Sequence, residues 1–141
     1  MDIPSGFRPM AELRTSPFLE RIGPFHFRRQ ADDLVLGLRI GEHHANARGA
    51  AHGGLLMTLA DVALGYQLAL SQDPPMRATT VSMSADFVGG ANLGEWLEAK
   101  VEMRQLGSRM AFANAYLVAG ERRVARVSAA FLRHDGERAA G

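Results

Sequence analysis

Residues 46–70, NARGAAHGGLLMTLADVALGYQLAL, begin as a loop rich in glycine and alanine and continue as a long apolar segment without proline. The change falls at Gly53 and Gly54, and the length and composition of residues 55–70 predict a helix. Apolar residues point in every direction around its turns, so we expect the helix to be buried on all sides. Asp61 lies in its middle, where a carboxylate is costly to bury unless it is paired, hydrogen-bonded or functional. Asp61 is therefore either a functional residue or a satisfied buried group that holds the fold together.

One face of the predicted helix differs from the others. Gly54, Thr58, Asp61 and Gly65 follow one another at steps of four, three and four residues, which places them on one line. Glycine inside a helix costs about 1 kcal/mol relative to alanine, so Gly65 indicates a packing reason. We expect a groove beside Asp61, filled by a ligand or by a neighbouring backbone, in which alanine at position 65 would clash and cost stability or activity.

The composition is that of a globular protein with one core. The chain has 141 residues, of which 47% are hydrophobic and 22% are charged. Sixteen basic and fifteen acidic residues give a formal charge of +1 without a basic block or stripe, which argues against nucleic acid as a partner. The chain has no cysteine, which excludes disulfides, thiolate metal sites and cysteine nucleophiles.

Two features argue against export and membrane insertion. Residues 1–18 contain no apolar stretch of the kind that a secretory signal needs. The long apolar run, residues 55–70, contains Asp61 and Gln67 and lacks basic flanks. We therefore expect a cytoplasmic protein without a membrane partner.

Turn and cap residues divide the rest of the chain into short elements. Ser16 and Pro17 form a helix-start signal, and Gly23 with Pro24 ends the short helix predicted over residues 17–22. Stretches that alternate or are rich in β-forming residues predict strands. These strands cover residues 25–29, 34–40, 78–88, 96–104, 110–119 and 122–133.

The order of these elements predicts an α+β fold, in which a long central helix is wrapped by an antiparallel β-sheet of five to six strands. We expect a single domain over residues 16–133, an irregular segment over residues 1–15 and a C-terminal tail over residues 134–141. Such a sheet has exposed edges and an uncovered face, so we expect self-association.

A spaced motif joins the loop to the helix. It reads Asn-x-x-Gly-x-x-His-Gly-Gly over residues 46–54, and Asp61 follows eight residues after the first glycine of the pair. This spacing resembles that of the hotdog-fold acyl-CoA thioesterases, and the group most similar is the phenylacetate-degradation and 4-hydroxybenzoyl-CoA thioesterase type. The resemblance extends from about residue 18 to residue 132. It includes the segments at residues 80–83, 93–95 and 107–112.

The resemblance implies an active site for thioester hydrolysis that needs no cofactor. The N–H of Gly53, at the helix N-terminus, would polarise the thioester carbonyl, and glycine suits this position because a side chain would block close approach. Asp61 would act as general base on water or as nucleophile on the thioester carbon. Asn46 would position the water or the carbonyl. In this family the asparagine and glycine usually come from one subunit and the acid from another, which implies a homodimer or a tetramer made of two dimers.

Thr80 corresponds to a serine or threonine that hydrogen-bonds the attacking water in related enzymes. Strand alternation places Thr80 on the face opposite Val81, Met83 and Phe87. If that apolar face covers the helix, Thr80 needs a β-bulge or a subunit interface to reach the site.

The resemblance also suggests residues that line or support the substrate site. His52 is expected to be structural, with its ring bonded to the loop backbone, and Gly54 and Gly65 are expected to line the groove. Ser108 and Arg109 would touch the phosphates of coenzyme A, or else form an ordinary solvated turn.

The histidines of the loop do not predict a metal site. His43 and His44 are adjacent and cannot easily face one ion together with His52, so we expect a solvated loop.

Two other functions remain open at this point. A hotdog hydratase or dehydratase would act on acyl thioesters with a differently placed Asp and His pair, which the sequence does not contain. A non-catalytic hotdog protein that binds acyl-CoA would be expected to lose the acid. The presence of Asp61 favours an enzyme, and the sequence leaves its acyl group open.

Overall fold

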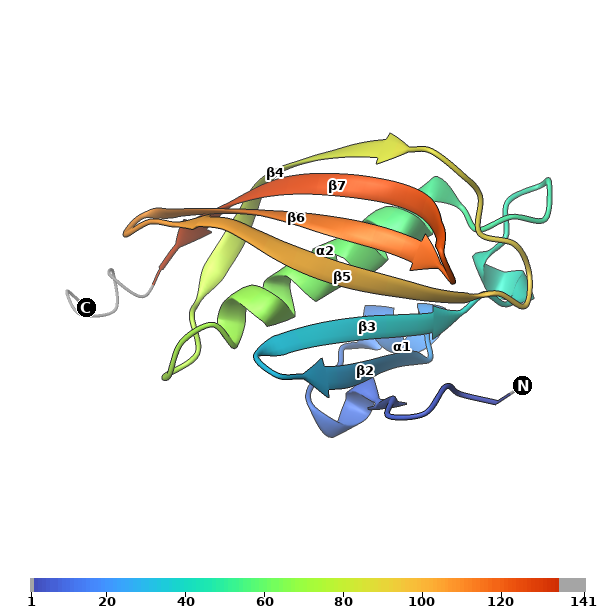
Figure 1. Cartoon of the computed structure of the whole chain (residues 1–141), viewed down its shortest axis with the longest axis horizontal. Coiled ribbons are helices and arrows are strands. Elements are labelled where there is room, and N and C mark those ends of the chain that lie inside the picture. The colour runs from blue at the N-terminus through green and yellow to red at the C-terminus, as the bar shows by residue number, and fades with distance from the viewer. Residues whose placement is uncertain (1, 135–141) are drawn as a thin grey trace.

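The framework of the protein is one long helix, α2 (Gly53–Ala69), that lies against one face of a curved antiparallel sheet (Figure 1). The computed structural model describes residues 2–134. Neighbouring strands are antiparallel throughout and follow the order β1-β2-β3-β5-β6-β7-β4. The other elements are β1 (Arg8–Pro9), η1 (Met10–Glu12), α1 (Pro17–Ile22), β2 (Phe25–Gln30), β3 (Asp33–Arg39), η2 (Glu42–His44), β4 (Ala78–Phe87), β5 (Trp96–Leu106), β6 (Met110–Ala119) and β7 (Arg122–Arg133).

The predicted arrangement of central helix and antiparallel sheet is present, with seven strands in place of five to six. The additional strand is β1, which pairs with Phe27 and His26 of β2. The segment expected to be irregular, residues 1–15, is therefore more ordered than predicted, because its backbone adds an edge to the sheet. Of the expected tail, residues 135–141 lie outside the described residues.

Local signals determine where the helices begin. The Ser16 side chain accepts a hydrogen bond from the Leu19 N–H at 3.3 Å, and Pro17 occupies the first turn of α1. This helix therefore has the bounds that the sequence predicted. α2 begins at Gly53, where the His52 side chain caps it.

The core lies between α2 and the sheet. Ala111, Ala113 and Ala115 of β6 are buried on the face that packs against α2. Their small side chains let the helix lie close to the sheet at the packing density of a protein interior. In β5, Leu97 and Ala99 are buried, in agreement with the predicted alternation.

A buried glutamine joins the C-terminal half of α2 to the hairpin of β2 and β3. Gln67 Oε1 accepts a hydrogen bond from the Leu34 N–H at 2.6 Å, and Gln67 Nε2 donates to the Asp32 carbonyl at 3.2 Å. Both ends of the buried amide are thus satisfied, as burial of a polar group requires.

The prediction that α2 is buried on all sides is wrong for the single chain. Leu59 and Leu64 are fully buried, whereas Asp61 and Gly65 are only partly buried and Gly54 is exposed. One sheet covers only one side of a helix, so the line of small and polar residues stays open.

The edge strand β4 runs beside this open face of α2 and is itself uncovered. Val81, Phe87 and Val88 expose 58%, 52% and 62% of their surface. An apolar sheet edge next to an open helix face is a surface that a second polypeptide can bury.

In the part of the chain that the structure describes, no helix is both long and apolar enough to cross a membrane.

Candidate active site

Asp61 is hydrogen-bonded to Thr80 across the gap between α2 and β4. Thr80 Oγ1 donates to Asp61 Oδ1 at 3.0 Å. The register of β4 against β7 shifts between Thr80 and Ser82, so Val81 is the extra residue of a β-bulge. The bulge reverses the alternation and turns Thr80 toward the helix. Thr80 was expected to need a β-bulge or a subunit interface to reach the site, and the bulge is present within one chain.

Asp61 and Thr80 lie in a pocket of about 450 Å³ at the C-terminal half of α2. Gly65 lines the same pocket one helical turn further on. A methyl group added at Gly65 would meet no atom within 4 Å. The groove beside Asp61 exists, but none of residues 2–134 makes it tight, and the expected clash of alanine at position 65 does not occur among them.

The N-terminus of α2 has a backbone donor, the Gly53 N–H, for which residues 2–134 supply no acceptor. His52 Nδ1 accepts from the Gly54 N–H at 3.0 Å, and the His52 carbonyl accepts from the N–H groups of Leu55 and Leu56. Within residues 2–134, the Gly53 N–H has no acceptor. An unpaired N–H at a helix N-terminus is suited to a carbonyl oxygen that gains negative charge. The His52 ring is bonded to backbone, as a structural role requires.

Asn46 organises the loop before the helix. Its Oδ1 accepts from the N–H groups of Arg48 and Ala50 at 2.8 and 3.2 Å. These two donors fix the orientation of the amide, because only oxygen can accept from them. The Nδ2 group has no acceptor among the described residues and is available as a donor. Gly49 has a φ of +83°, which favours glycine and explains its place in the motif.

His44 is buried and bonded to backbone, which corrects the expectation of a solvated loop at this residue, whereas His43 and His52 are exposed as expected. His44 is buried, its Nδ1 accepts from the Gly41 N–H at 2.9 Å, and its Nε2 contacts the Ile22 carbonyl at 2.5 Å. His43 Nε2 lies 2.7 Å from the Gly23 carbonyl. Burial is the main cause that lowers the pKa of His44, which keeps its imidazole neutral. Within residues 2–134, no three His, Asp or Glu side chains form a group that could hold a metal ion.

Gly53 and Asp61 belong to two separate half-sites. They lie eight residues apart on one helix, which corresponds to about 12 Å at about 1.5 Å per residue. Asn46 and Gly53 lie at the helix N-terminus, beside a second pocket of about 430 Å³ that His52, Gly54 and neighbouring residues line. One thioester carbonyl cannot contact the Gly53 N–H and the Asp61 carboxylate of the same chain.

Ser108 and Arg109 lie outside both pockets. They are exposed in the turn between β5 and β6, where the Gly107 N–H donates to the Met110 carbonyl at 2.9 Å. Instead, Arg14 and Arg77 line the pocket of Asp61. Neither arginine was predicted as a site residue, because neither belongs to a motif and Arg14 lies in the segment expected to be irregular.

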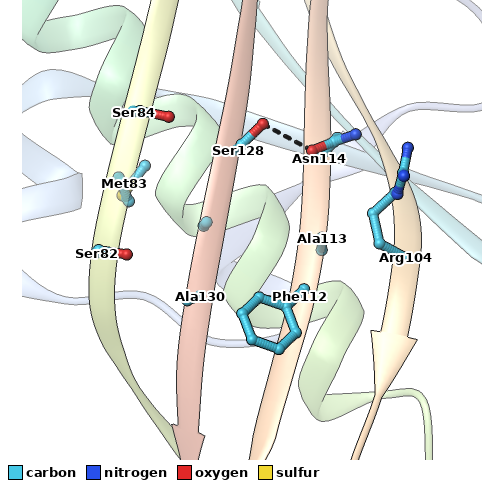
Figure 2. Close-up of a pocket in the computed structure, with 10 residues that line it drawn as sticks. Ser82, Met83, Ser84, Arg104, Phe112, Ala113, Asn114, Ser128 and Ala130 are labelled. Atoms are coloured by element: carbon cyan, nitrogen blue, oxygen red, sulfur yellow. Dashed lines mark hydrogen bonds between the residues drawn. The ribbon is translucent and has the colours of Figure 1, made fainter.

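A third, shallow pocket of about 290 Å³ lies on the outer face of the sheet (Figure 2). Ser82, Ser128 and Phe112 line it, and Ser128 Oγ donates to Asn114 Oδ1 at 2.8 Å. Figure 2 shows α2 behind the strands that carry these residues. The sheet separates this pocket from Asp61, and no carboxylate lines it, so it is not the candidate active site.

Comparison with known proteins places the chain among thioesterases. The model of the family described as Thioesterase superfamily matches residues 48–126. The Pseudomonas aeruginosa protein named "Putative esterase PA0474" is 51% identical over 132 residues, which are 93% of this chain and 97% of that protein. The mouse protein named acyl-coenzyme A thioesterase 13 is 26% identical over 86 residues, 61% of each chain.

Solved structures agree with the fold. A mutant of the phenylacetic acid degradation protein PaaI from Thermus thermophilus superposes with a TM-score of 0.75 at 25% identity, over 84% of this chain and 99% of that one. A hypothetical thioesterase from Streptococcus pneumoniae, solved with coenzyme A, gives a TM-score of 0.71 at 21% identity, over 77% and 87% of the two chains.

The long helix packed against one antiparallel sheet is thus the α+β hotdog fold, as the sequence predicted. The chain belongs to the thioesterase superfamily and is structurally close to the PaaI proteins of phenylacetate degradation. The family resemblance found in the sequence is confirmed.

Proposed function

We propose that the protein hydrolyses the thioester of an acyl- or aryl-acyl-coenzyme A to the free acid and coenzyme A. The observation that carries this proposal is the Asp61 carboxylate, which lies in an open pocket and accepts a hydrogen bond from Thr80 at 3.0 Å. The unused Gly53 N–H supplies the complementary group for the carbonyl oxygen. The similarity to the mouse protein named acyl-coenzyme A thioesterase 13 supports coenzyme A as the carrier.

The active site in this proposal forms between two copies of the chain. The separation of about 12 Å between Gly53 and Asp61 requires a second chain to bring the two groups to one carbonyl. The open face of α2 and the apolar edge β4 lie where such a chain would pack. The assembly is therefore a homodimer, or a tetramer built from two such dimers.

The chemistry follows from the groups at each half-site. Water gives a proton to Asp61 as its oxygen adds to the thioester carbon, the C–S bond breaks, and the thiolate of coenzyme A takes up a proton. In the alternative route, Asp61 attacks the carbon itself and water hydrolyses the resulting anhydride. In both routes the Gly53 N–H binds the carbonyl oxygen as its negative charge develops, a contribution of about 2.7–4 kcal/mol for one donor.

Asn46 and Thr80 support these steps. The Asn46 Nδ2 group is a second donor for the carbonyl oxygen or for the water, because its Oδ1 is occupied by the loop backbone. The Thr80 hydroxyl donates a hydrogen bond to Asp61, and its oxygen lone pairs can accept a hydrogen bond from the attacking water. His52 and Gly54 shape the helix N-terminus from which Gly53 acts.

The test is release of thiol from a panel of acyl- and aryl-acyl-CoAs, followed with a thiol-reactive dye. Asp61→Asn should lower kcat by about 10²–10⁴, the usual range for general-base catalysis. Asp86→Asn is the matched control, because Asp86 pairs with Arg126 at 2.8 Å and is exposed. Hydrolysis at the wild-type rate by Asp61→Asn would remove Asp61 from the mechanism. Tight binding without thiol release would instead identify a binding protein, and addition of water to an enoyl thioester would identify a hydratase.

A further inference from the structure

The pocket of Asp61 carries more positive than negative charge. Arg14 and Arg77 line it together with Asp61, and no other carboxylate of the described residues does. The guanidinium group of arginine carries a positive charge and only donates hydrogen bonds. Among residues 2–134, neither arginine forms an ion pair. Two cations beside a single carboxylate in one pocket, neither of them ion-paired within the described residues, favour an anionic ligand.

Hydrogen bonds to their main-chain carbonyls position the backbone of both arginines. The carbonyl of Arg14 accepts a hydrogen bond from the Tyr66 hydroxyl of α2 at 2.9 Å. Burial raises the pKa of Tyr66, and the positive charge of Arg14 partly offsets this shift. The carbonyl of Arg77 accepts from the His134 N–H at 2.8 Å, and the preceding residue, Met76, is buried and bonded to the end of α2.

Arg77 lies at a distance from the reacting groups. Arg77 precedes Thr80 by three residues of extended chain, which corresponds to about 10 Å at about 3.3 Å per residue. Leu68, Met76 and Phe131 line the pocket and give it apolar walls. A ligand that reaches Arg77 from Asp61 therefore has an apolar spacer that ends in an anion.

We propose that Arg14 and Arg77 bind an anionic group of the substrate and so determine which thioesters the enzyme prefers. This inference rests on the proposed thioesterase function and deepens it. The anion is either a carboxylate at the far end of the acyl group or a phosphate of coenzyme A. Both present oxygens that a guanidinium binds in the same way.

The experiment compares four thioesters that separate these two sources. Hexanoyl and adipoyl groups differ by a terminal carboxylate, and each is attached either to coenzyme A or to pantetheine, which lacks phosphate. The variants are Arg14→Gln, Arg77→Gln and the double variant, with Arg14→Lys and Arg77→Lys as charge-conserving forms. Arg29→Gln is the matched control, because Arg29 is exposed and lines neither pocket of the two half-sites.

If the acyl carboxylate is bound, each glutamine variant lowers kcat/KM for both adipoyl thioesters by about tenfold, mainly through KM, and leaves the hexanoyl thioesters unchanged. If a coenzyme A phosphate is bound, the loss appears with both coenzyme A thioesters and with neither pantetheine thioester. In either case the lysine variants recover part of the activity, and added salt reduces the difference between wild type and variant.

The proposal is overturned if the glutamine variants behave like Arg29→Gln, or if they lower kcat/KM equally for all four substrates, hexanoyl-pantetheine included. Circular dichroism and the unfolding midpoint show whether each variant is folded. Absence of thiol release by the wild type would contradict the proposed function alone. The same four thioesters are then compared by equilibrium binding, in which loss of affinity restricted to the anionic ones supports the role of the arginines and uniform affinity contradicts it.

Discussion

The two half-sites of this protein are built in different ways. The half-site at the start of α2 consists of neighbours in sequence: Asn46 closes its loop through Arg48 and Ala50, and His52 caps the helix that Gly53 begins. The half-site in the middle of α2 joins residues from distant elements. Thr80 reaches Asp61 only because the register of β4 slips by one residue. The residues of the first half-site belong to one sequence motif, whereas the second half-site depends on the register in which β4 pairs with β7.

The largest effect on the first half-site is expected from Gly53→Pro. Proline is tolerated in the first turn of a helix, and the backbone of His52, with a φ of −63° and a ψ of 140°, suits the residue before proline. The substitution removes the N–H and nothing else that the fold uses, so kcat should fall by about 10²–10³. Gly53→Ala is the control, because it keeps the N–H and its methyl group would meet the Phe87 ring at an ordinary 3.6 Å, so any loss of kcat in this variant measures the effect of a side chain alone. Equal kcat values for the two variants, with helix content unchanged, would exclude this donor.

Mixing one variant of each half-site tests whether the Gly53 half-site of one chain and the Asp61 half-site of another form one active site. Gly53→Pro and Asp61→Asn are each inactive as homodimers, but a random mixture contains heterodimers with one intact site. Thiol release should recover to about one quarter of the wild-type rate after the variants are unfolded and refolded together. A mixture that stays as inactive as its components would mean that Gly53 of one chain and Asp61 of another do not act on the same carbonyl, and light scattering that finds only monomers would lead to the same conclusion.

A smaller loss is expected from Thr80→Val, which removes the hydrogen bond to Asp61 and keeps the shape of the side chain. Hydrogen bonds to charged groups contribute about 1.5–3 kcal/mol, so kcat should fall by about tenfold to a hundredfold. Ser82→Ala, beyond the bulge and on the outer face, should leave kcat unchanged. If the two variants have the same kcat, the bulge at Val81 has no role in placing the acid.

The stability of Gly65→Ala tests what fills the groove. Among the described residues, no atom outside the adjacent helix backbone lies within 4 Å of the added methyl group, so the isolated chain should gain up to about 1 kcal/mol in unfolding free energy. The same methyl group narrows the pocket, and turnover of bulky acyl-CoAs should fall more than that of short ones. A loss of stability that grows with protein concentration would show that a second chain, and not the substrate, occupies this groove.

The smallest effect is a dependence of stability on pH through His44 and His26. Burial lowers the pKa of both below the value of 6.5 that they have when exposed. The unfolded chain therefore binds more protons just below pH 6.5, and the unfolding free energy should decrease as the pH falls through the pKa values of the folded state. Denaturant titrations on either side of about pH 6.5 measure this decrease. His44→Gln should make it shallower, and an unchanged slope would mean that His44 does not contribute.

The sequence alone determined the elements and the first half-site, because the signals are local. Ser16 and Pro17 define the start of α1, and the spacing from Asn46 to Asp61 predicted the family. Alternation placed β5, and turn residues gave β6 and β7 the bounds that the structure has.

Only the tertiary structure decided the second half-site and the surroundings of Asp61. The bulge at Val81, the burial of His44, the open face of α2 and the approach of Arg14 and Arg77 to Asp61 all depend on contacts between residues distant in sequence. Periodicity tells which residues share a face, but it carries no information about a slip in register or about which side of a helix one sheet leaves uncovered. Those features are fixed when the strands pair and the helix packs against them, and they determine which side chains surround the reacting carboxylate.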